Sequence, residues 1–351
     1  MQMSFLNDDF RTHKKYVDGV FKTKQEIIDE LNKNGVKHIF KILSFGGGTQ
    51  SSQLLEKCLR GEKNYDYDAV VMSDVGAEPD FIHKQVEWWQ LRQKELGNTT
   101  PFIITQHNSM KKGIEEMLMR YISSECEYQR MQLPLYCNQV DENGEEVKGG
   151  LLPRQCTVDF KIIPVKQAAR QLALKQLGLK PNQRMPKDVA FIIDIGFSYD
   201  EMRRINMYQS PQYKYMYLSY PLVEENLTTE DSIDFLKENN MPNKRSRCYL
   251  CPFNCDDKES GMDWAEIIED EPLSFLKACF FDEQVRAVQR SGKKMLRSIP
   301  YFHYKRLPLS EVYAEDYHSL TQKFGEDLNE WKEEWEQFIA EKYKYVESKS
   351  V

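Results

Sequence analysis

Residues 41–52, with the sequence KILSFGGGTQSS, place three consecutive glycines between an apolar run and a segment with helical periodicity. Ile42, Leu43 and Phe45 predict a buried strand, and the following SSQLLEKCLR predicts an amphipathic helix. A glycine turn lets backbone N–H groups come close to a ligand, because no Cβ stands in the way. The first N–H groups of a helix also have no internal partners, and the helix dipole adds partial positive charge there. The sequence therefore predicts a strand–turn–helix unit that binds an anion, with phosphate the usual ligand.

Two common phosphate-binding patterns do not fit this loop. A Walker A loop ends in Gly-Lys-Ser/Thr, and the lysine is missing here. A dinucleotide fingerprint needs a glycine or alanine where this chain has Ser51. A glycine-rich turn without a ligand stays open as the alternative, because short glycine motifs recur by accident.

The composition is that of an ordinary globular protein. The 351 residues are 40% hydrophobic and 29% charged, enough for one large or two modest domains with ample core. The net charge of −7 argues against broad, sequence-independent nucleic-acid binding, although a local basic groove stays open. No apolar run approaches the ~18 residues of a membrane span. The N-terminal stretch lacks the apolar segment of a secretory signal, so we expect a cytoplasmic protein without membrane contact.

The chain divides into three expected regions. Residues 1–36 predict an N-terminal helical extension, and 37–240 predict a nucleotide-binding α/β domain. Within that domain, the polar, glycine-containing span at about 123–150 predicts an active-site flap or a small β-hairpin insertion. Residues 241–351 carry a cysteine motif and helical patterns. Strands alternate with helices, which indicates an α/β fold with a mostly parallel sheet flanked by helices.

Acidic residues follow two of the expected strands. Asp74 comes after the apolar run 69–72, at the rim where ligands bind in open α/β sheets. Its alternative role is a helix-capping or turn aspartate. Asp200 and Glu201 follow the long apolar run 189–195 and could hold Mg²⁺ or pair with Arg203. A solvated charged helix start is their alternative.

Cysteine spacing indicates a metal or cluster. Cys248 and Cys251 form a C-x-x-C pair, and Cys255 adds a third thiol within reach. Soft thiolates so spaced favour zinc or an iron–sulfur cluster, and Cys156 is the natural fourth ligand. Cys126 or Cys137 could substitute for it. A redox dithiol or inert cysteines are the alternatives.

Basic residues surround Cys156. Arg154 lies two residues before it and Lys161 five residues after it, just ahead of a helical pattern. Basic side chains at a helix start can hold phosphate or sulfate. An ordinary basic helix start over a buried cysteine is the alternative.

Together these stretches resemble, in order, phage- and prophage-type proteins related to phosphoadenosine-phosphosulfate (PAPS) reductase, within the PP-loop ATP pyrophosphatase or adenine nucleotide alpha-hydrolase superfamily. The matching segments are SFGGGTQSS for the loop SGG-x-x-S, SDVGAE for D-T-G-x-E, RQCTVDFKIIP for R-x-C-T-x-x-x-K-x-x-P, GFSYDEMRR for G-x-S-x-D-E-x-x-R, and KRSRCYLCPF for K-x-S-x-C-x-x-C-P-F.

The resemblance implies a Rossmann-like fold and attack at the α-phosphate of ATP, with release of pyrophosphate and sulfur transfer or another modification of an acceptor. It implies ATP or a related adenine nucleotide with Mg²⁺, bound by Ser44, Gly46, Gly47, Gly48, Gln50, Ser51, Asp74, Gly76, Asp200 and Glu201. The implied catalytic residues are Arg154, Lys161 and Ser51. A [4Fe–4S] cluster or Zn²⁺ would be held by Cys156, Cys248, Cys251 and Cys255.

Two departures from the family pattern limit these implications. Thr49 and Gln50 stand where many PP-loops carry Lys and Asp, so pyrophosphatase activity stays open. The chain has no Glu-Cys-Gly-Leu-His tail, and we therefore do not expect PAPS reduction. The alternatives are a non-catalytic nucleotide-binding subunit of a modification or defence complex, and a zinc-stabilised structural protein with a vestigial pocket. Expected partners are the nucleotide, a small-molecule or nucleic-acid acceptor, and a protein partner or second copy.

Overall fold

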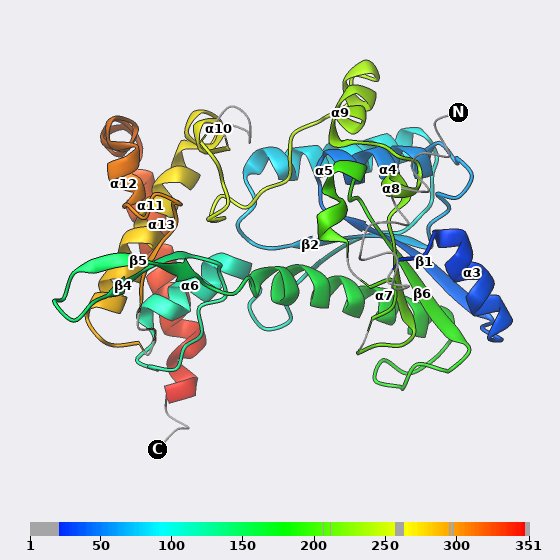
Figure 1. Cartoon of the computed structure of the whole chain (residues 1–351), viewed down its shortest axis with the longest axis horizontal. Coiled ribbons are helices and arrows are strands. Elements are labelled where there is room, and N and C mark those ends of the chain that lie inside the picture. Colours follow the sequence, from blue (N-terminus) through cyan, green and yellow to red (C-terminus); the bar gives the residue numbers. More distant parts are fainter. Residues whose placement is uncertain are drawn as a thin grey trace. The chain divides into compact units, whose positions relative to one another are not determined.

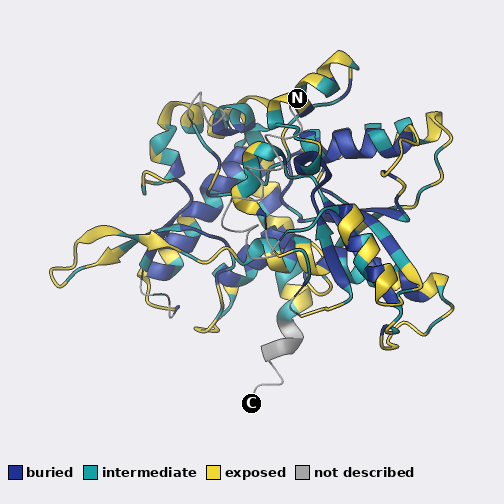
Figure 2. Cartoon of the chain, turned by 45° about the vertical axis from the view of Figure 1, so that its right-hand side comes forward, coloured by how far each residue is buried: buried dark blue, intermediate teal, exposed yellow. Residues whose placement is uncertain are grey.

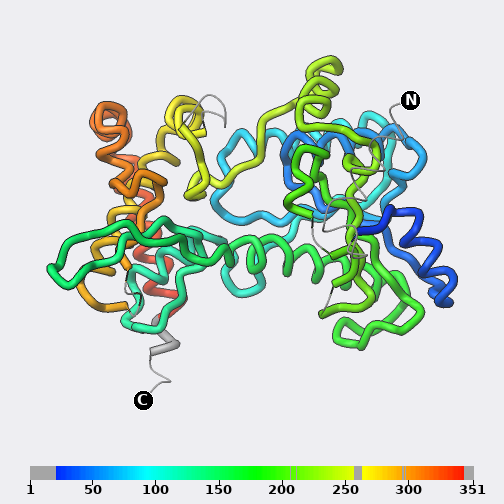
Figure 3. The backbone as a smooth tube through the Cα atoms, viewed as in Figure 1, coloured from blue at the N-terminus to red at the C-terminus, as the bar shows by residue number. Residues whose placement is uncertain are grey.

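The computed structural model describes residues 21–205, 207–210, 212–256, 263–294, 296 and 298–347, which form two compact units (Figure 1). Unit 1 consists of the chain up to Ser73, Phe81–Thr105 and Pro164–Ser246. Unit 2 consists of Asp74–Asp80, Gln106–Ile163 and the chain from Arg247 onward. Each unit is therefore assembled from three separate segments, and the chain path in Figure 3 passes back and forth between them.

A five-stranded, mostly parallel sheet forms the centre of unit 1. Its order is β3-β2-β1-β6-β7, and the pairs β1–β2, β1–β6 and β6–β7 are parallel. The strands are β1 (His38–Phe45), β2 (Ala69–Asp74), β3 (Phe102–Gln106), β6 (Val189–Ile195) and β7 (Met216–Ser219). The predicted α/β class, with a mostly parallel sheet flanked by helices, is confirmed.

Side chains of the central strands alternate between two helix-covered faces, as the period of a strand requires. Leu43 and Phe45 of β1 pack in one core cluster with α4 and α5, whereas Phe40 and Ile42 pack in another with α7. Such double coverage explains the nearly continuous apolar runs of β2 and β6, which Figure 2 shows as buried. The helices of unit 1 are α3 (Lys24–Lys33), α4 (Thr49–Leu59), α5 (Asp80–Glu95), α7 (Ile163–Gln176), η2 (Tyr199–Arg204), α8 (Pro221–Glu224) and α9 (Thr229–Glu238).

The predicted outer helix near the amino terminus corresponds to α3. Thr23 and Glu26 form a capping box at its start. Ile27 and Leu31 are buried against Ile192 and neighbouring residues of β6 and β7. Residues 1–20 of the expected extension lie outside the described residues.

Unit 2 combines a helical core with a small antiparallel sheet of order β5-β4-β8. Trp264, Phe275, Phe281, Phe302 and Trp331 dominate its core. Its elements are α6 (Gly113–Ser123), β4 (Tyr136–Val140), β5 (Glu146–Leu151), the π-helical turn η1 (Val158–Ile162), α10 (Asp263–Asp270), α11 (Pro272–Arg290), β8 (Ser298–Tyr301), α12 (Leu309–Val312) and α13 (Ala314–Glu347).

The expected insertion at about 123–150 contains a β-hairpin. Strands β4 and β5 pair antiparallel on either side of a turn at Asp141–Glu145. Most residues of β5 are exposed, so this hairpin projects part of its surface to solvent (Figure 2). The structure thus shows a β-hairpin in this span, and a role as an active-site flap stays a prediction.

Candidate functional site

The glycine turn lies where the strand order of the unit 1 sheet reverses. Strands β2 and β3 lie on one side of β1, and β6 and β7 lie on the other. Gly46 follows the end of β1, and Gly196 follows the end of the neighbouring β6. Ligands in open α/β sheets bind outside the carboxyl ends of strands at such a point.

Open amides line the turn. Ser52 N–H makes the first backbone bond of α4, donating to the carbonyl of Gly48 at 3.0 Å. The amides of Gly47 to Ser51 have no acceptor in the described part of the chain. The Ser51 hydroxyl donates to the Gly48 carbonyl at 3.0 Å and accepts from the Gly46 amide at 3.2 Å. Ser51 thus fixes the conformation of the turn, and amides without an internal acceptor at a helix start suit an anion.

Two glycines allow other segments to reach the turn. A Cβ built at Gly196 would lie 2.9 Å from the amide nitrogen of Ser51 and 3.1 Å from its Cα. A Cβ built at Gly48 would lie 2.9 Å from both the nitrogen and the Cβ of Ser246. Only glycine fits at either position without moving backbone atoms. Gly196 therefore packs its backbone closely against the start of α4, which a side chain would prevent.

Gln85 of α5 connects the turn to the basic segment that contains Lys244. Its buried side-chain amide donates to the carbonyls of Gly47 and, at 3.1 Å, Lys244, and its oxygen accepts from Lys244 N–H at 3.1 Å. The Lys244 ammonium lies 5.0 Å from the centre of the Phe81 ring. The backbone of the Lys244 segment is thereby held beside the glycine turn through Gln85. Sequence reasoning missed Gln85, because a polar residue in an amphipathic helix carries no sign that it is buried.

Gln50 contacts Glu201, and Gln50 and Asp200 both contact the start of α9. The Gln50 amide lies 3.4 Å from Glu201 Oε2 and 3.3 Å from Thr229 Oγ1. Asp200 accepts the Thr229 N–H at 2.9 Å and its hydroxyl at 2.7 Å. Burial opposes ionisation of Asp200, but hydrogen bonds from Thr229 and Ser198 outweigh it and lower its pKa. These carboxylates therefore already have partners at the start of α9.

Ser44 and Glu201, two further residues predicted to contact the nucleotide, take part in the strand pairing and the ion pairs of unit 1. Ser44 is half-buried in β1, in register with Ile195 of β6. Glu201 forms its ion pair with Arg204, one residue beyond the predicted Arg203. A role of Ser44, Gln50, Asp200 or Glu201 toward a nucleotide stays a prediction.

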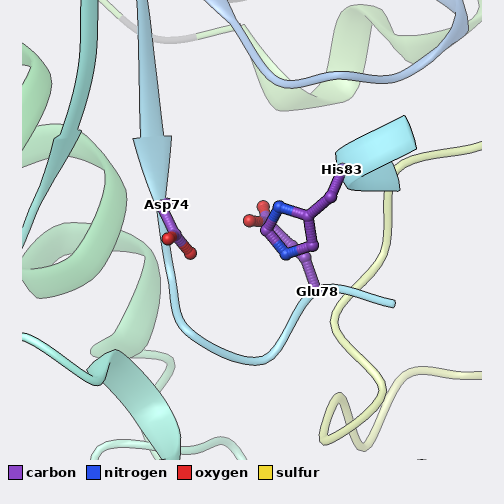
Figure 4. A group of neighbouring side chains, drawn as sticks. All are labelled: Asp74, Glu78 and His83. Carbon is purple, nitrogen blue, oxygen red and sulfur yellow. The ribbon is translucent and has the colours of Figure 1, made fainter. Parts of the chain in front are cut away.

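Asp74 and Gly76 belong to the turn that begins unit 2. Asp74 Oδ1 accepts the N–H of Gly76 at 2.8 Å, which is the turn-aspartate geometry weighed as the alternative. Figure 4 draws Asp74 at the end of β2, Glu78 farther along this turn and His83 on α5. The nucleotide contacts predicted for Asp74 and Gly76 stay predictions.

Three of the predicted thiol ligands lie together in unit 2. Burial, followed by the charge of Cys251, raises the pKa of Cys248, and the charge of Cys156 acts in the same direction. Burial likewise raises the pKa of Cys251. Cys251 N–H donates to the Cys248 carbonyl at 3.0 Å, closing the C-x-x-C turn. Thiols about a hundred residues apart in sequence therefore lie within electrostatic range.

Two cations accompany these thiols. Arg154 and Lys161 both act to lower the pKa of Cys251, and Lys161 also acts on Cys248. Neither has an ion-pair or hydrogen-bond partner among the residues that the structure describes. Lys161 lies in the π-helical turn η1, an irregularity that is frequent at functional sites. The neighbourhood of the thiols is therefore suited to negative charge.

Cys255 has a different partner. Its thiol donates to Asp263 Oδ2 at 3.0 Å, and Asp263 Oδ1 lies 2.7 Å from Arg247. Cys137 is buried, with a pKa raised to about 11 by burial, and Cys126 is exposed. The assignment of Cys255 as a ligand stays a prediction.

The spacing of the thiols bears on the kind of group they could hold. In a tetrahedral zinc site with Zn–S bonds of ~2.3 Å, sulfur atoms lie ~3.8 Å apart. Cys156, Cys248 and Cys251 are not among the described groups whose ligand atoms all lie within 4.8 Å of one another, so at least one pair of sulfurs is farther apart. A [4Fe–4S] cluster binds each thiolate to a different iron and so suits wider spacing. The donor set fits a cluster better than a closed zinc site.

No protein-family model matches this sequence, and no curated protein matches it either. Within the described residues, no helix has both the length and the apolar character needed to cross a bilayer.

Proposed function

We propose that the glycine turn of unit 1 binds the phosphates of an adenine nucleotide, and that the protein cleaves ATP between the α- and β-phosphates. The observation that supports this proposal is the row of open amides from Gly47 to Ser51 at the start of an 11-residue helix, at the switch point of the sheet. Aligned N–H groups and the helix dipole attract a multiply charged anion there. The adenine base is assigned from the resemblance of the loop and its neighbouring motifs.

The chemistry follows from what such a site can stabilise. An acceptor oxygen attacks the α-phosphorus, the bond to the α–β bridging oxygen breaks, and pyrophosphate leaves with Mg²⁺. The amides of the turn would hold the leaving phosphates. Fixed donors of this kind are the usual source of acceleration in phosphoryl chemistry. Arg154 and Lys161 of unit 2 stay predicted catalytic residues, and their lack of ion-pair and hydrogen-bond partners in the described part of the chain agrees with a role toward an anion.

Mg²⁺ would enter with the nucleotide in this proposal. Asp200 is engaged with Thr229, and Glu201 with Arg204 and Gln50. Phosphate oxygens and water are sufficient ligands for Mg²⁺, which is seldom bound by an all-protein cage. The carboxylates would then support the site without coordinating the ion.

Cys156, Cys248 and Cys251 are the residues proposed to hold an iron–sulfur cluster. Such a cluster would supply electron transfer or a labile sulfur for the acceptor. Lys161 and Arg154 would offset the negative charge that thiolate ligands bring.

An assay of ATP conversion to AMP and pyrophosphate tests the proposal, using protein purified without oxygen. The Gly196→Ala variant should lose nucleotide binding and turnover together, because the new Cβ would press on the Ser51 amide. Gly150→Ala is the matched control, since a Cβ there meets nothing within 4 Å. A wild-type protein that shows no nucleotide binding, or a Gly196→Ala variant that binds normally, would overturn it.

A non-catalytic nucleotide-binding subunit is the second candidate. Thr49 and Gln50 replace the usual Lys and Asp, and both side chains hydrogen-bond within the protein, Thr49 to the Asn243 carbonyl at 3.2 Å. This candidate predicts binding of ATP with no pyrophosphate released. The same assay, combined with a binding measurement, distinguishes the two.

A further inference from the structure

Four side chains of unit 2 form a row in which cations flank aromatic rings. The Arg154 guanidinium carbon lies 5.6 Å from the centre of the Phe253 ring. Phe253 meets Tyr136 edge-on, with ring centres 6.3 Å apart, and Arg306 lies 5.6 Å from the centre of Tyr136. The four residues come from four different segments: the loop after β5, the turn after the C-x-x-C pair, strand β4, and the stretch after β8. We call this row the cation–aromatic surface.

The two ends of the surface differ in freedom. Arg306 donates at 3.2 Å to the carbonyls of Cys137 and Gly149, so its guanidinium is fixed by the backbone. Arg154 is exposed and has no hydrogen-bond or ion-pair partner in the described residues. Phe253 is 38% exposed, unusual for a ring bordered by structured segments. The surface therefore presents a partly exposed ring beside a cation that has no ion-pair partner in the described residues.

The surface borders the predicted cluster ligands. Arg154 lies close enough to Cys251 to influence its ionisation, and Cys251 in turn acts on Tyr136. Lys161, also without a partner in the described residues, acts on the same cysteine. A molecule bound on Phe253 and Arg154 would thus lie next to Cys251.

We propose that the cation–aromatic surface binds single-stranded nucleic acid, with an unpaired base stacked on Phe253 and a backbone phosphate on Arg154. Aromatic faces accept any unstacked base, and neighbouring basic groups follow the phosphates. A duplex would hide the base faces, so the strand must be single. The role of the bound strand as the acceptor that attacks ATP rests on the proposed function. The binding of the strand by itself does not.

The charge of the protein restricts such binding to this surface. The whole chain carries −7, and the tip of the neighbouring hairpin is acidic, with Asp141, Glu142 and Glu145. A nucleic-acid strand would therefore be repelled by the tip and held at the base of the hairpin, where Arg154 and Arg306 lie. An acidic peptide would share the attraction to arginine but would gain less from an exposed ring.

Fluorescence anisotropy with labelled 12-nucleotide RNA and DNA of mixed sequence, in the absence of ATP, tests the inference. The Phe253→Leu variant, which keeps an apolar side chain without a π-face, should weaken binding by about five- to a hundredfold. Arg154→Gln should weaken binding of all sequences and reduce the salt dependence by about one phosphate contact. Lys323→Ala, which removes an exposed cation from α13, is the matched control and should bind as the wild type does.

Several outcomes would overturn the inference. They are absence of binding, equal binding of an abasic probe, and an unchanged affinity of correctly folded Phe253→Leu protein. Competition by polyglutamate at equal charge would assign the surface to an acidic protein partner instead. ATP binding is measured on the same samples: protein that binds ATP but no oligonucleotide refutes this inference alone. Protein that binds the oligonucleotide but no ATP refutes the proposed function alone.

Discussion

The glycine turn of unit 1 and the thiol region of unit 2 are both suited to negative charge, but they achieve it by opposite means. The turn uses uncharged amides of the main chain, from Gly47 to Ser51, and depends on side chains being absent at Gly48 and Gly196. The thiol region uses side-chain cations, Arg154 and Lys161, close to cysteines. A backbone site is damaged by adding atoms, whereas a side-chain site is damaged by removing them.

The largest effect should come from adding one carbon to the turn. In Gly48→Ala the new Cβ would meet the nitrogen and Cβ of Ser246 at 2.9 Å, so the backbone of one segment must move. Displacement of reacting groups by about 1 Å can cost about a hundredfold, and we expect a loss of nucleotide affinity of at least that size. In Gly46→Ala the nearest atom is Ser51 Oγ at 3.9 Å, an ordinary contact, so a much smaller loss is expected. Isothermal titration measures the ATP affinity of both variants. Equal affinities of Gly48→Ala and Gly46→Ala would contradict the expected difference between the two positions.

The next effect should come from removing single sulfur atoms. Cys156→Ser, Cys248→Ser and Cys251→Ser should each lose most of the bound iron and sulfide, because each removes a ligand from a shared site. Cys255→Ser should keep it, since that thiol donates to Asp263 and serine can do the same. Metal and sulfide analysis after anaerobic purification measures both. Loss of iron in Cys255→Ser would make Cys255 the fourth ligand.

An intermediate effect should follow loss of the connection between the turn and the Lys244 segment. Gln85→Leu leaves the buried carbonyl of Gly47 and the part-buried carbonyl and N–H of Lys244 without their partner, at about 1–3 kcal/mol of stability. We expect ATP affinity to fall about tenfold, because a difference of 1.4 kcal/mol in binding corresponds to that factor. Gln93→Leu, on the same helix but hydrogen-bonded to Asn98 and Thr100, is the control and should retain affinity. An unchanged affinity in Gln85→Leu would show that the turn holds its geometry without this contact.

The smallest effect on either site should come from substituting Glu224. This residue belongs to unit 1, and its carboxylate accepts the N–H of Lys24 at 2.9 Å. Burial is the main cause that raises its pKa from 4.5 to about 7. Between these values the folded protein holds a proton that the unfolded chain has lost, so the free energy of unfolding falls as pH rises. Glu224→Gln should flatten this decline, which is on the order of 2 kcal/mol, and leave ATP affinity unchanged.

Chemical denaturation at pH 5, 6 and 7.5 measures the effect of Glu224→Gln. Glu230→Gln, an exposed carboxylate in the first turn of α9, should keep the wild-type slope. Identical pH slopes for wild type and Glu224→Gln would contradict the assignment.

The local parts of the fold were predictable from sequence, and the parts that depend on distant contacts were not. The strand, glycine turn and helix of residues 38–59 follow from apolar spacing within a single window. Gln85, Gly196 and Ser246 reach the turn from segments up to about two hundred residues away, and no period in the sequence records that approach.

The same distinction explains the carboxylates and thiols. Asp200 follows a strand, as a nucleotide ligand would, yet its partner is the start of α9, which only the folded chain brings to it. Cys255 has the spacing of a ligand, but the proximity of Asp263 gives its thiol another hydrogen-bond partner. Residue type and spacing indicate which groups could bind a metal or nucleotide, and the neighbours decide which remain available.

The interleaving of the two units affects how the protein can be made. A ribosome releases the glycine turn early, but Gly196 and the Lys244–Ser246 segment emerge only after most of the chain has been synthesised. The growing polypeptide thus cannot complete the packing around the glycine turn until late in translation. For the same reason, no single cut in the gene separates the two units.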